Sequence, residues 1–113
     1  MQTYAKTRIV QHMKRIVWTG SSKEDVRDFP AAARREAGYQ LDKLQRGELP
    51  DDWKPMPTIG PGVREIRIRD AAGAFRVIYV AHVADAVHVL HGFQKINQHD
   101  VRIARSRLSL VTR

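Results

Sequence analysis

The chain has 113 residues, no cysteine, and 20 Lys and Arg against 12 Asp and Glu, which gives a net charge of +8. This length favours a single domain over residues 1–113, and the absence of cysteine excludes disulfides and thiolate zinc sites. No apolar run reaches the roughly 18 residues that a membrane span needs, and the N-terminal residues lack the apolar core of a secretory signal. We therefore expect a cytoplasmic protein that does not contact a membrane.

The first half of the chain predicts one strand followed by two helices. Residues 1–12 show no clear period, so they form either a flexible extension or a continuation of the strand. Residues 13–19 are rich in β-prone side chains and predict that strand. A short helix is expected from Ser22, and a longer one runs from Pro30 to a terminal glycine, Gly47. The apolar stripe of the longer helix consists of Ala33, Ala37, Leu41 and Leu44.

The segments 49–62 and 100–111 predict a loop and a final helix. Residues 49–62 hold four of the five prolines and two glycines, a composition typical of loops. The final helix is expected to begin with Asp100 as its N-cap residue. Its apolar stripe consists of Val101, Ala104, Leu108 and Val111. Its arginines, Arg102, Arg105 and Arg107, are expected to face away from the core.

Three consecutive strands are predicted within residues 63–95. Ala84 and Asp85 are interpreted as a two-residue turn, which places Arg76 opposite Phe93. Residues 71–74 are interpreted as a four-residue turn, which places Arg69 opposite Arg76. Since side chains alternate along a strand, this register separates an apolar face from a cationic one. The apolar face consists of Ile66, Ile68, Phe75, Val77, Tyr79 and Leu90, and the cationic face of Arg67, Arg69, Arg76, His91 and Phe93, with Lys95 just beyond.

The cationic face has the groups that metal-independent cleavage of RNA requires. Arginine side chains bind phosphate oxygens with paired donors, and Arg67, Arg69 and Arg76 lie together. His91 can exchange a proton near neutral pH, and Phe93 offers a ring on which an unstacked base can lie. Taken singly, each arginine is more often an ordinary solvated residue of a half-buried strand. The clustering is what indicates a phosphate site.

The segments REIRIRD, GAFRVIYVA and VHVLHGFQK, after two helices and a Pro-rich loop, resemble the RelE/HigB-like toxins of bacterial toxin–antitoxin pairs, and most closely the phage-associated Gp49-like branch. The resemblance implies a compact α+β domain in which a small, twisted antiparallel sheet carries the two N-terminal-half helices on one face and has a C-terminal helix. It also implies a ribosome-dependent endonuclease that cuts mRNA in the ribosomal A site, needs no cofactor or metal, and is neutralised by a cognate antitoxin, often a helix-turn-helix protein. The residues carried over as catalytic are Arg76, His91, Arg69 and Lys95, and those assigned to RNA binding are Arg67, Phe93, Arg64 and Arg102.

Two alternatives to the endonuclease remain. ParE-like relatives of this family inhibit DNA gyrase, and a catalytically degenerate homologue would only bind its antitoxin. The second alternative is motivated by Ile96 and Asn97, which follow Lys95 where members of this branch usually carry a second lysine and a threonine. No metal site is predicted, because His88 and His91 are three residues apart on a strand and are expected on opposite faces.

Overall fold

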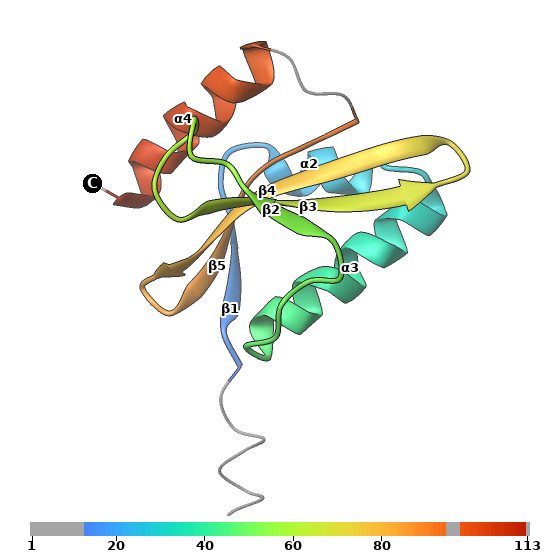
Figure 1. Cartoon of the computed structure of the whole chain (residues 1–113), viewed down its shortest axis with the longest axis horizontal. Helices are drawn as coiled ribbons and strands as arrows, with labels where there is room; N and C mark the ends of the chain where they lie inside the picture. Colours follow the sequence, from blue (N-terminus) through green and yellow to red (C-terminus); the bar gives the residue numbers. More distant parts are fainter. Residues whose placement is uncertain (1–12, 95–97, 113) are drawn as a thin grey trace, which may run out of the picture.

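The centre of the molecule is a five-stranded sheet with the order β1-β5-β4-β3-β2. The computed structural model describes residues 13–94 and 98–112. The strands are β1 (Arg15–Trp18), β2 (Trp53–Pro55), β3 (Val63–Asp70), β4 (Gly73–Val83) and β5 (Ala86–Phe93). All neighbouring strands are antiparallel except β1, which runs parallel to β5 (Figure 1). The α+β class and the mainly antiparallel sheet are confirmed, and the parallel pairing of β1 is an addition.

In the part of the chain that the structure describes, three helices cover the two faces of this sheet. They are α2 (Ser22–Arg27), α3 (Ala31–Gln45) and α4 (Gln98–Thr112). Helices α2 and α3 pack on one face, called here the α3 face, and α4 packs on the other, called the α4 face (Figure 1). The two N-terminal-half helices and the C-terminal helix are therefore where the sequence predicted them. None of the helices in the described part of the chain is long and apolar enough to span a membrane.

The α3 face carries the larger apolar core. The stripe predicted on α3 is buried against the sheet, as are most of the strand residues predicted to face it. The buried members of this core are Val26, Phe29, Ala33, Ala37, Leu41, Leu44, Ile66, Ile68, Phe75, Val77, Tyr79, Val87 and Val89. Burial raises the pKa of the Tyr79 phenol, and the nearby Arg64 guanidinium partly offsets that rise. Tyr79 is thus a core residue, as predicted.

The hairpin between β3 and β4 differs from the predicted register by two residues. Ala71 and Ala72 form a two-residue turn, so Arg67 pairs with Arg76 and Arg69 pairs with Ala74. The predicted four-residue turn was wrong, because Gly73, with a φ of +128°, and Ala74 pair within the strand instead. A shift of two residues leaves every side chain on its original face. The separation into two faces therefore survived the error.

The hairpin between β4 and β5 follows the predicted turn, but its pairing shifts at two places that were not predicted, between Ile78 and Tyr79 and between Val80 and Val83. Ala84 and Asp85 both have positive φ angles, 53° and 52°, which suits a tight two-residue hairpin turn. Ile78 pairs with His91, as expected, but the next pair along is Tyr79 with Val89. The extra residue, Leu90, was expected on the α3 face and lies instead in the α4 core.

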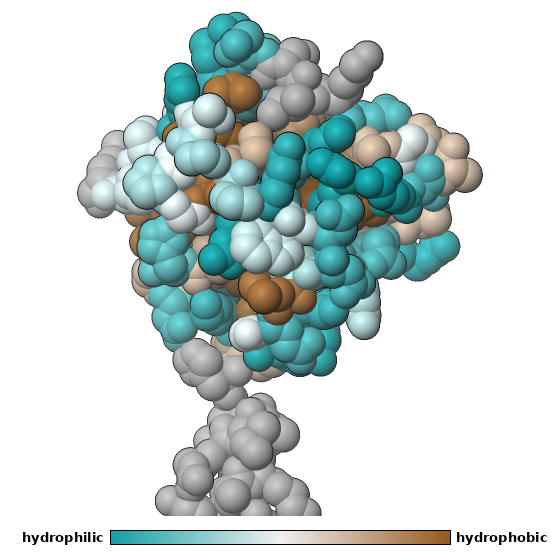
Figure 2. All heavy atoms as spheres, in the orientation of Figure 1, coloured by the Kyte–Doolittle hydropathy of each residue, from teal (hydrophilic) through white to brown (hydrophobic). Residues whose placement is uncertain are grey.

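The Pro-rich segment is not entirely a loop. Its residues Trp53–Pro55 form β2, which pairs with β3 at the edge of the sheet. Proline is tolerated there because an edge strand leaves one row of backbone groups unpaired. Within the described residues, the large exposed apolar side chains are Met13, Tyr39, Leu49 and Leu110, on four separate segments. Figure 2 accordingly shows a mainly hydrophilic face with small separate apolar spots.

Candidate functional site

Three arginines of the β3–β4 hairpin share the α4 face. Arg67 and Arg76 are a cross-strand pair, and Arg69 follows two residues after Arg67 on the same face. The tip of this hairpin extends away from α4, so the helix leaves this end of the face uncovered (Figure 1). The Arg69 side chain is 72% exposed and that of Arg76 is 22% exposed. Arg67, Arg69 and Arg76 are called the arginine cluster below.

A buried carboxylate holds Arg76 in place. The Oε2 atom of Glu65 lies 3.7 Å from Nε of Arg76, and Nη1 of Arg76 donates a 2.8 Å hydrogen bond to the backbone carbonyl of Gln94. Glu65 is 1% exposed, and its other carboxylate oxygen has no hydrogen-bond partner within the described residues. The guanidinium is therefore fixed from two sides. Its charge is also partly neutralised, since Glu65 lies on the face that the sequence predicted to be cationic.

His91 is enclosed between two carboxylates from different helices. Its Nδ1 lies 3.2 Å from Oδ2 of Asp25 on α2, and its Nε2 lies 2.7 Å from Oδ1 of Asp100 on α4. The residue is 6% exposed, so neither nitrogen faces solvent or an RNA. Asp100 was expected as the N-cap residue, but α4 begins earlier, at Gln98, so Asp100 lies in the first turn of the helix, where its carboxylate contacts His91.

Phe93 is also buried, in contrast to its predicted role as a stacking platform. Its ring stacks on His91 with a centroid distance of 5.2 Å and an interplanar angle of 24°. Only 9% of the residue is exposed, because α4 packs its apolar stripe over this part of the sheet. In this arrangement the ring supports the His91 imidazole and offers no free face to a base.

The three arginines of α4 have different surroundings. Arg102 is exposed, as predicted. Arg105 reaches the backbone carbonyl of Thr58 with two donors. Arg107 was expected to face away from the core but turns inward, where its Nη1 donates a 2.8 Å hydrogen bond to the carbonyl of Leu90 and lies 3.5 Å from Asp25. The His91 and Arg107 contacts together fasten α4 to β5 and α2.

His88 and His91 were expected on opposite faces of the sheet, but they lie on the same face. His88 pairs with Val80 and His91 with Ile78, and both partners belong to the α4 core. The bulge in β5 therefore brings the two histidines to the same face. Nε2 of His88 contacts the carbonyl of Val83 at 3.0 Å, and His91 is held by its two carboxylates. Within the part of the chain that the structure describes, no group of three or more His, Asp or Glu side chains is arranged to hold a metal ion.

Comparisons with known proteins agree with this architecture. The family model of the phage-derived protein Gp49-like (DUF891) matches residues 24–109. The chain belongs to this family. Among solved structures, a mutant of the Escherichia coli toxin RelE in its free state matches with a TM-score of 0.66 and 13% identity, over 85% of this chain and 98% of the RelE chain. No curated protein matches. The resemblance predicted from the strand motifs is thus confirmed, and the chain is a Gp49-like protein with a RelE-like fold.

The structure of this Gp49-like protein brings only part of the predicted site together. Arg67, Arg69 and Arg76 form one cluster, and their catalytic and RNA-binding roles stay predictions. Arg64 lies on the α3 face, across from Tyr79, because its position in β3 alternates with that of Arg67. Lys95 lies outside the described residues, as do Ile96, Asn97 and the predicted extension 1–12.

Sequence reasoning missed the acidic partners of the site. For Glu65 a signal was available, since it precedes Arg67 by two residues in a strand and must share its face. For Asp25 there was none, because it is 66 residues from His91 in the sequence. The resulting site can bind phosphate through fixed guanidinium groups, and its histidine is positioned to stabilise the fold around them.

Proposed function

We propose that this Gp49-like protein is the toxin of a toxin–antitoxin pair and acts in the cytoplasm. In this proposal it is a ribosome-dependent endonuclease that cleaves mRNA in the ribosomal A site. Membership of the family and the RelE-like fold support a toxin. The net charge of +8 suits both an RNA substrate and an acidic surface of the antitoxin, for which a helix-turn-helix protein is our expectation.

The observation that carries this proposal is the fixed guanidinium of Arg76 beside Arg67. In RNA cleavage the 2′-hydroxyl loses its proton and attacks the phosphorus, the bond to the 5′-oxygen breaks, and that oxygen gains a proton, which leaves a 2′,3′-cyclic phosphate and a 5′-hydroxyl. Negative charge accumulates on the phosphate oxygens in the transition state. A guanidinium that is held in advance by Glu65 and the Gln94 carbonyl stabilises that charge without reorganising. Arg69, at the exposed end of the cluster, would contact the same or the neighbouring phosphate. For His91, the two carboxylates favour a positioning role over proton transfer.

The test is cleavage mapping in a purified bacterial translation system, with the same RNA incubated without ribosomes. We expect cuts only in the translated sample, and we expect Arg76→Ala to reduce their rate by about 100-fold or more. Arg76→Ala also removes the ion-pair partner of Glu65, which lowers stability. The decisive variant is therefore Arg76→Ala with Glu65→Gln, which removes both charges of the pair, and we expect it to fold because no unpaired buried carboxylate remains.

An exposed arginine on the other side of the molecule provides the matched control. Arg35 lies on α3, so Arg35→Ala should leave cleavage unchanged. If the double variant is stably folded and still cuts at the normal rate, Arg76 is not the catalytic arginine. Cuts in both samples would indicate a free ribonuclease. If the native protein cuts neither sample but causes DNA breaks in cells, gyrase becomes the target.

One observation favours a second candidate function, a homologue that binds its antitoxin without cleaving RNA. His91 and Phe93 are both buried, so the predicted acid–base group and base platform do not face a substrate. This candidate predicts no cleavage in either sample, no growth arrest on expression, and stable complex formation with the product of an adjacent antitoxin gene.

A further inference from the structure

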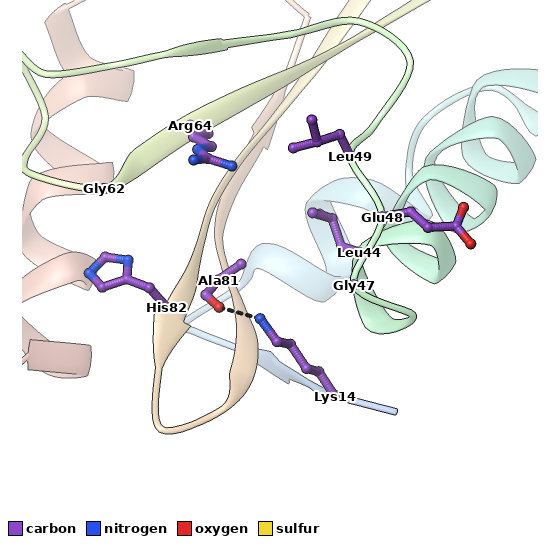
Figure 3. Close-up of a pocket in the computed structure, with 9 residues that line it drawn as sticks. All are labelled: Lys14, Leu44, Gly47, Glu48, Leu49, Gly62, Arg64, Ala81 and His82. Atoms are coloured by element: carbon purple, nitrogen blue, oxygen red, sulfur yellow. Dashed lines mark hydrogen bonds between the residues drawn. The ribbon is translucent and has the colours of Figure 1, made fainter. Parts of the chain in front are cut away.

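A cavity of about 370 Å³ lies on the α3 face, away from the arginine cluster. It is bounded by the segment before β1, the C-terminal end of α3, the start of β3 and the end of β4 (Figure 3). Its polar and charged lining side chains are Lys14, Glu48, Arg64 and His82, and its apolar ones are Leu44, Leu49 and Ala81. This volume falls within the range of small-molecule sites.

Two cations in the cavity are fixed by the protein. Nζ of Lys14 donates a 2.8 Å hydrogen bond to the backbone carbonyl of Ala81. The guanidinium carbon of Arg64 lies 4.4 Å from the centre of the Trp53 ring, a cation–π contact. Neither cation forms an ion pair with a carboxylate of the described residues. Figure 3 shows them on two sides of Ala81.

Glu48, the one acidic side chain that the described residues contribute to the lining, does not neutralise them. Glu48 lies 3.3 Å from Nη1 of Arg46, and its carboxylate points away from the cavity in Figure 3. His82 adds a third nitrogen-bearing side chain, and its ring lies against the backbone of Gly62. Gly62 has a φ of +76°, and a Cβ there would collide with that ring, so glycine is what allows this arrangement. The cavity is therefore positively charged, in contrast to the site around Arg76.

The apolar wall suggests what accompanies the anion. Leu44 and Leu49 come from the end of α3 and the following loop, and Leu49 is 56% exposed at the cavity. A ligand that fits has a strongly anionic group for Lys14 and Arg64 and a flat apolar part for the leucines. Two fixed cations match a phosphate, with a charge near −2 and three acceptor oxygens, better than they match a carboxylate.

We propose that this cavity is a binding site for a nucleoside phosphate, with the phosphate on Lys14 and Arg64 and the base against Leu44 and Leu49. The phosphate can belong to a free nucleotide or to the 5′ end of an RNA. The site is independent of the proposed cleavage activity, since Arg64 lies on the sheet face opposite to Arg76.

Calorimetric titration of the purified protein tests this with adenosine 5′-monophosphate, adenosine, inorganic phosphate, and a short RNA with and without a 5′-phosphate. We expect the monophosphate to bind at least about 10-fold more tightly than adenosine or phosphate alone, and Arg64→Gln or Lys14→Gln to weaken it by about 10-fold or more. A preference for the phosphorylated RNA over the free nucleotide would identify an RNA end as the source. Arg15→Gln and Arg35→Gln, which change the net charge equally at exposed positions, should have no effect.

Arg64 is partly enclosed, so a variant that cannot disturb folding is needed as well. Leu49→Glu places a negative charge at an exposed position of the cavity and should abolish phosphate binding while the unfolding transition is unchanged. The proposal is overturned if none of the phosphates binds, if the control variants weaken binding as much as the cavity variants, or if a blocked Asp-Leu dipeptide binds as tightly as the monophosphate. The last result would assign the cavity to a protein partner.

Discussion

The two faces of the sheet are both covered by helices, but they are stabilised differently. The α3 face is closed mainly by apolar side chains from α2, α3 and three strands, and the polar side chains that α2 and α3 bury, Ser22 and Gln40, are uncharged. The α4 face combines an apolar cluster with buried polar groups, among them Glu65, His88 and His91. Buried apolar area stabilises a fold directly, whereas buried charges must be paired to avoid a large cost. We therefore expect the apolar packing of the α3 face to contribute more to the free energy of unfolding than the mixed packing of the α4 face.

The nitrogen-bearing side chains of the α4 face become more exposed toward the tip of the hairpin, from 8% for His91 to 22% for Arg76 and 72% for Arg69. His91, enclosed by Asp25 and Asp100, lies where α4 covers the strands. The Glu65–Arg76 pair comes next, and Arg69 is at the open end of the hairpin. A helix over one part of the face thus separates charges that stabilise the fold from charges that remain available to a ligand.

The largest effect is expected from the α3 face. Ile66 is fully buried in its core, and Ile66→Ala should lower the free energy of unfolding by about 2–5 kcal/mol. Leu108 of α4 is only partly buried, so Leu108→Ala should cost about 1–2 kcal/mol. Urea unfolding followed by circular dichroism measures both. Equal losses for the two variants would show that the faces contribute alike and would contradict the comparison.

An intermediate effect is expected where α4 is fastened to the sheet. His91→Leu removes the imidazole that bridges Asp25 and Asp100 and should cost about 1.5–3 kcal/mol, typical of hydrogen bonds to charged groups. A double-mutant cycle with Asp100→Asn should show that the two losses are not additive. The control is His99→Leu, at an exposed position of α4, which should change stability by less than about 0.5 kcal/mol. An additive cycle would mean that the His91–Asp100 contact contributes nothing to stability.

The sequence predicted the features that depend on the alternation of side chains along a strand. It did not predict those that depend on contacts between segments far apart in the chain. Because side chains alternate along a β-strand, the sequence correctly predicted that Ile66, Ile68 and Val77 lie on the apolar face. That assignment held even though the β3–β4 turn was misjudged, because an error of two residues preserves the face. The bulge at Leu90 was beyond such reasoning, since it inserts one residue and reverses the pattern.

The candidate site was predicted less completely. Placing Arg67, Arg69 and Arg76 on one face required only strand alternation, and the structure agrees. The burial of His91 and Phe93 required knowing that α4 folds back over β5, which depends on contacts such as Arg107 with Leu90. A pattern of residue types shows which groups share a face, but it does not show which of them a later helix will cover.

The smallest effect on stability is expected at Arg69, where the effect on function should be large. Its side chain is 72% exposed and lies 3.9 Å from Asp52, so Arg69→Gln should change the free energy of unfolding by less than about 0.5 kcal/mol. If the exposed end of the α4 face contacts RNA phosphates, the same variant should weaken RNA binding. It should also reduce the slope of the logarithm of the binding constant against the logarithm of the salt concentration by about one. Filter binding over a series of salt concentrations measures that slope, with Arg35→Gln as the control. Unchanged RNA binding by Arg69→Gln would mean that the open end of the hairpin is a solvated surface, and that the charges fixed on the α4 face serve the fold alone.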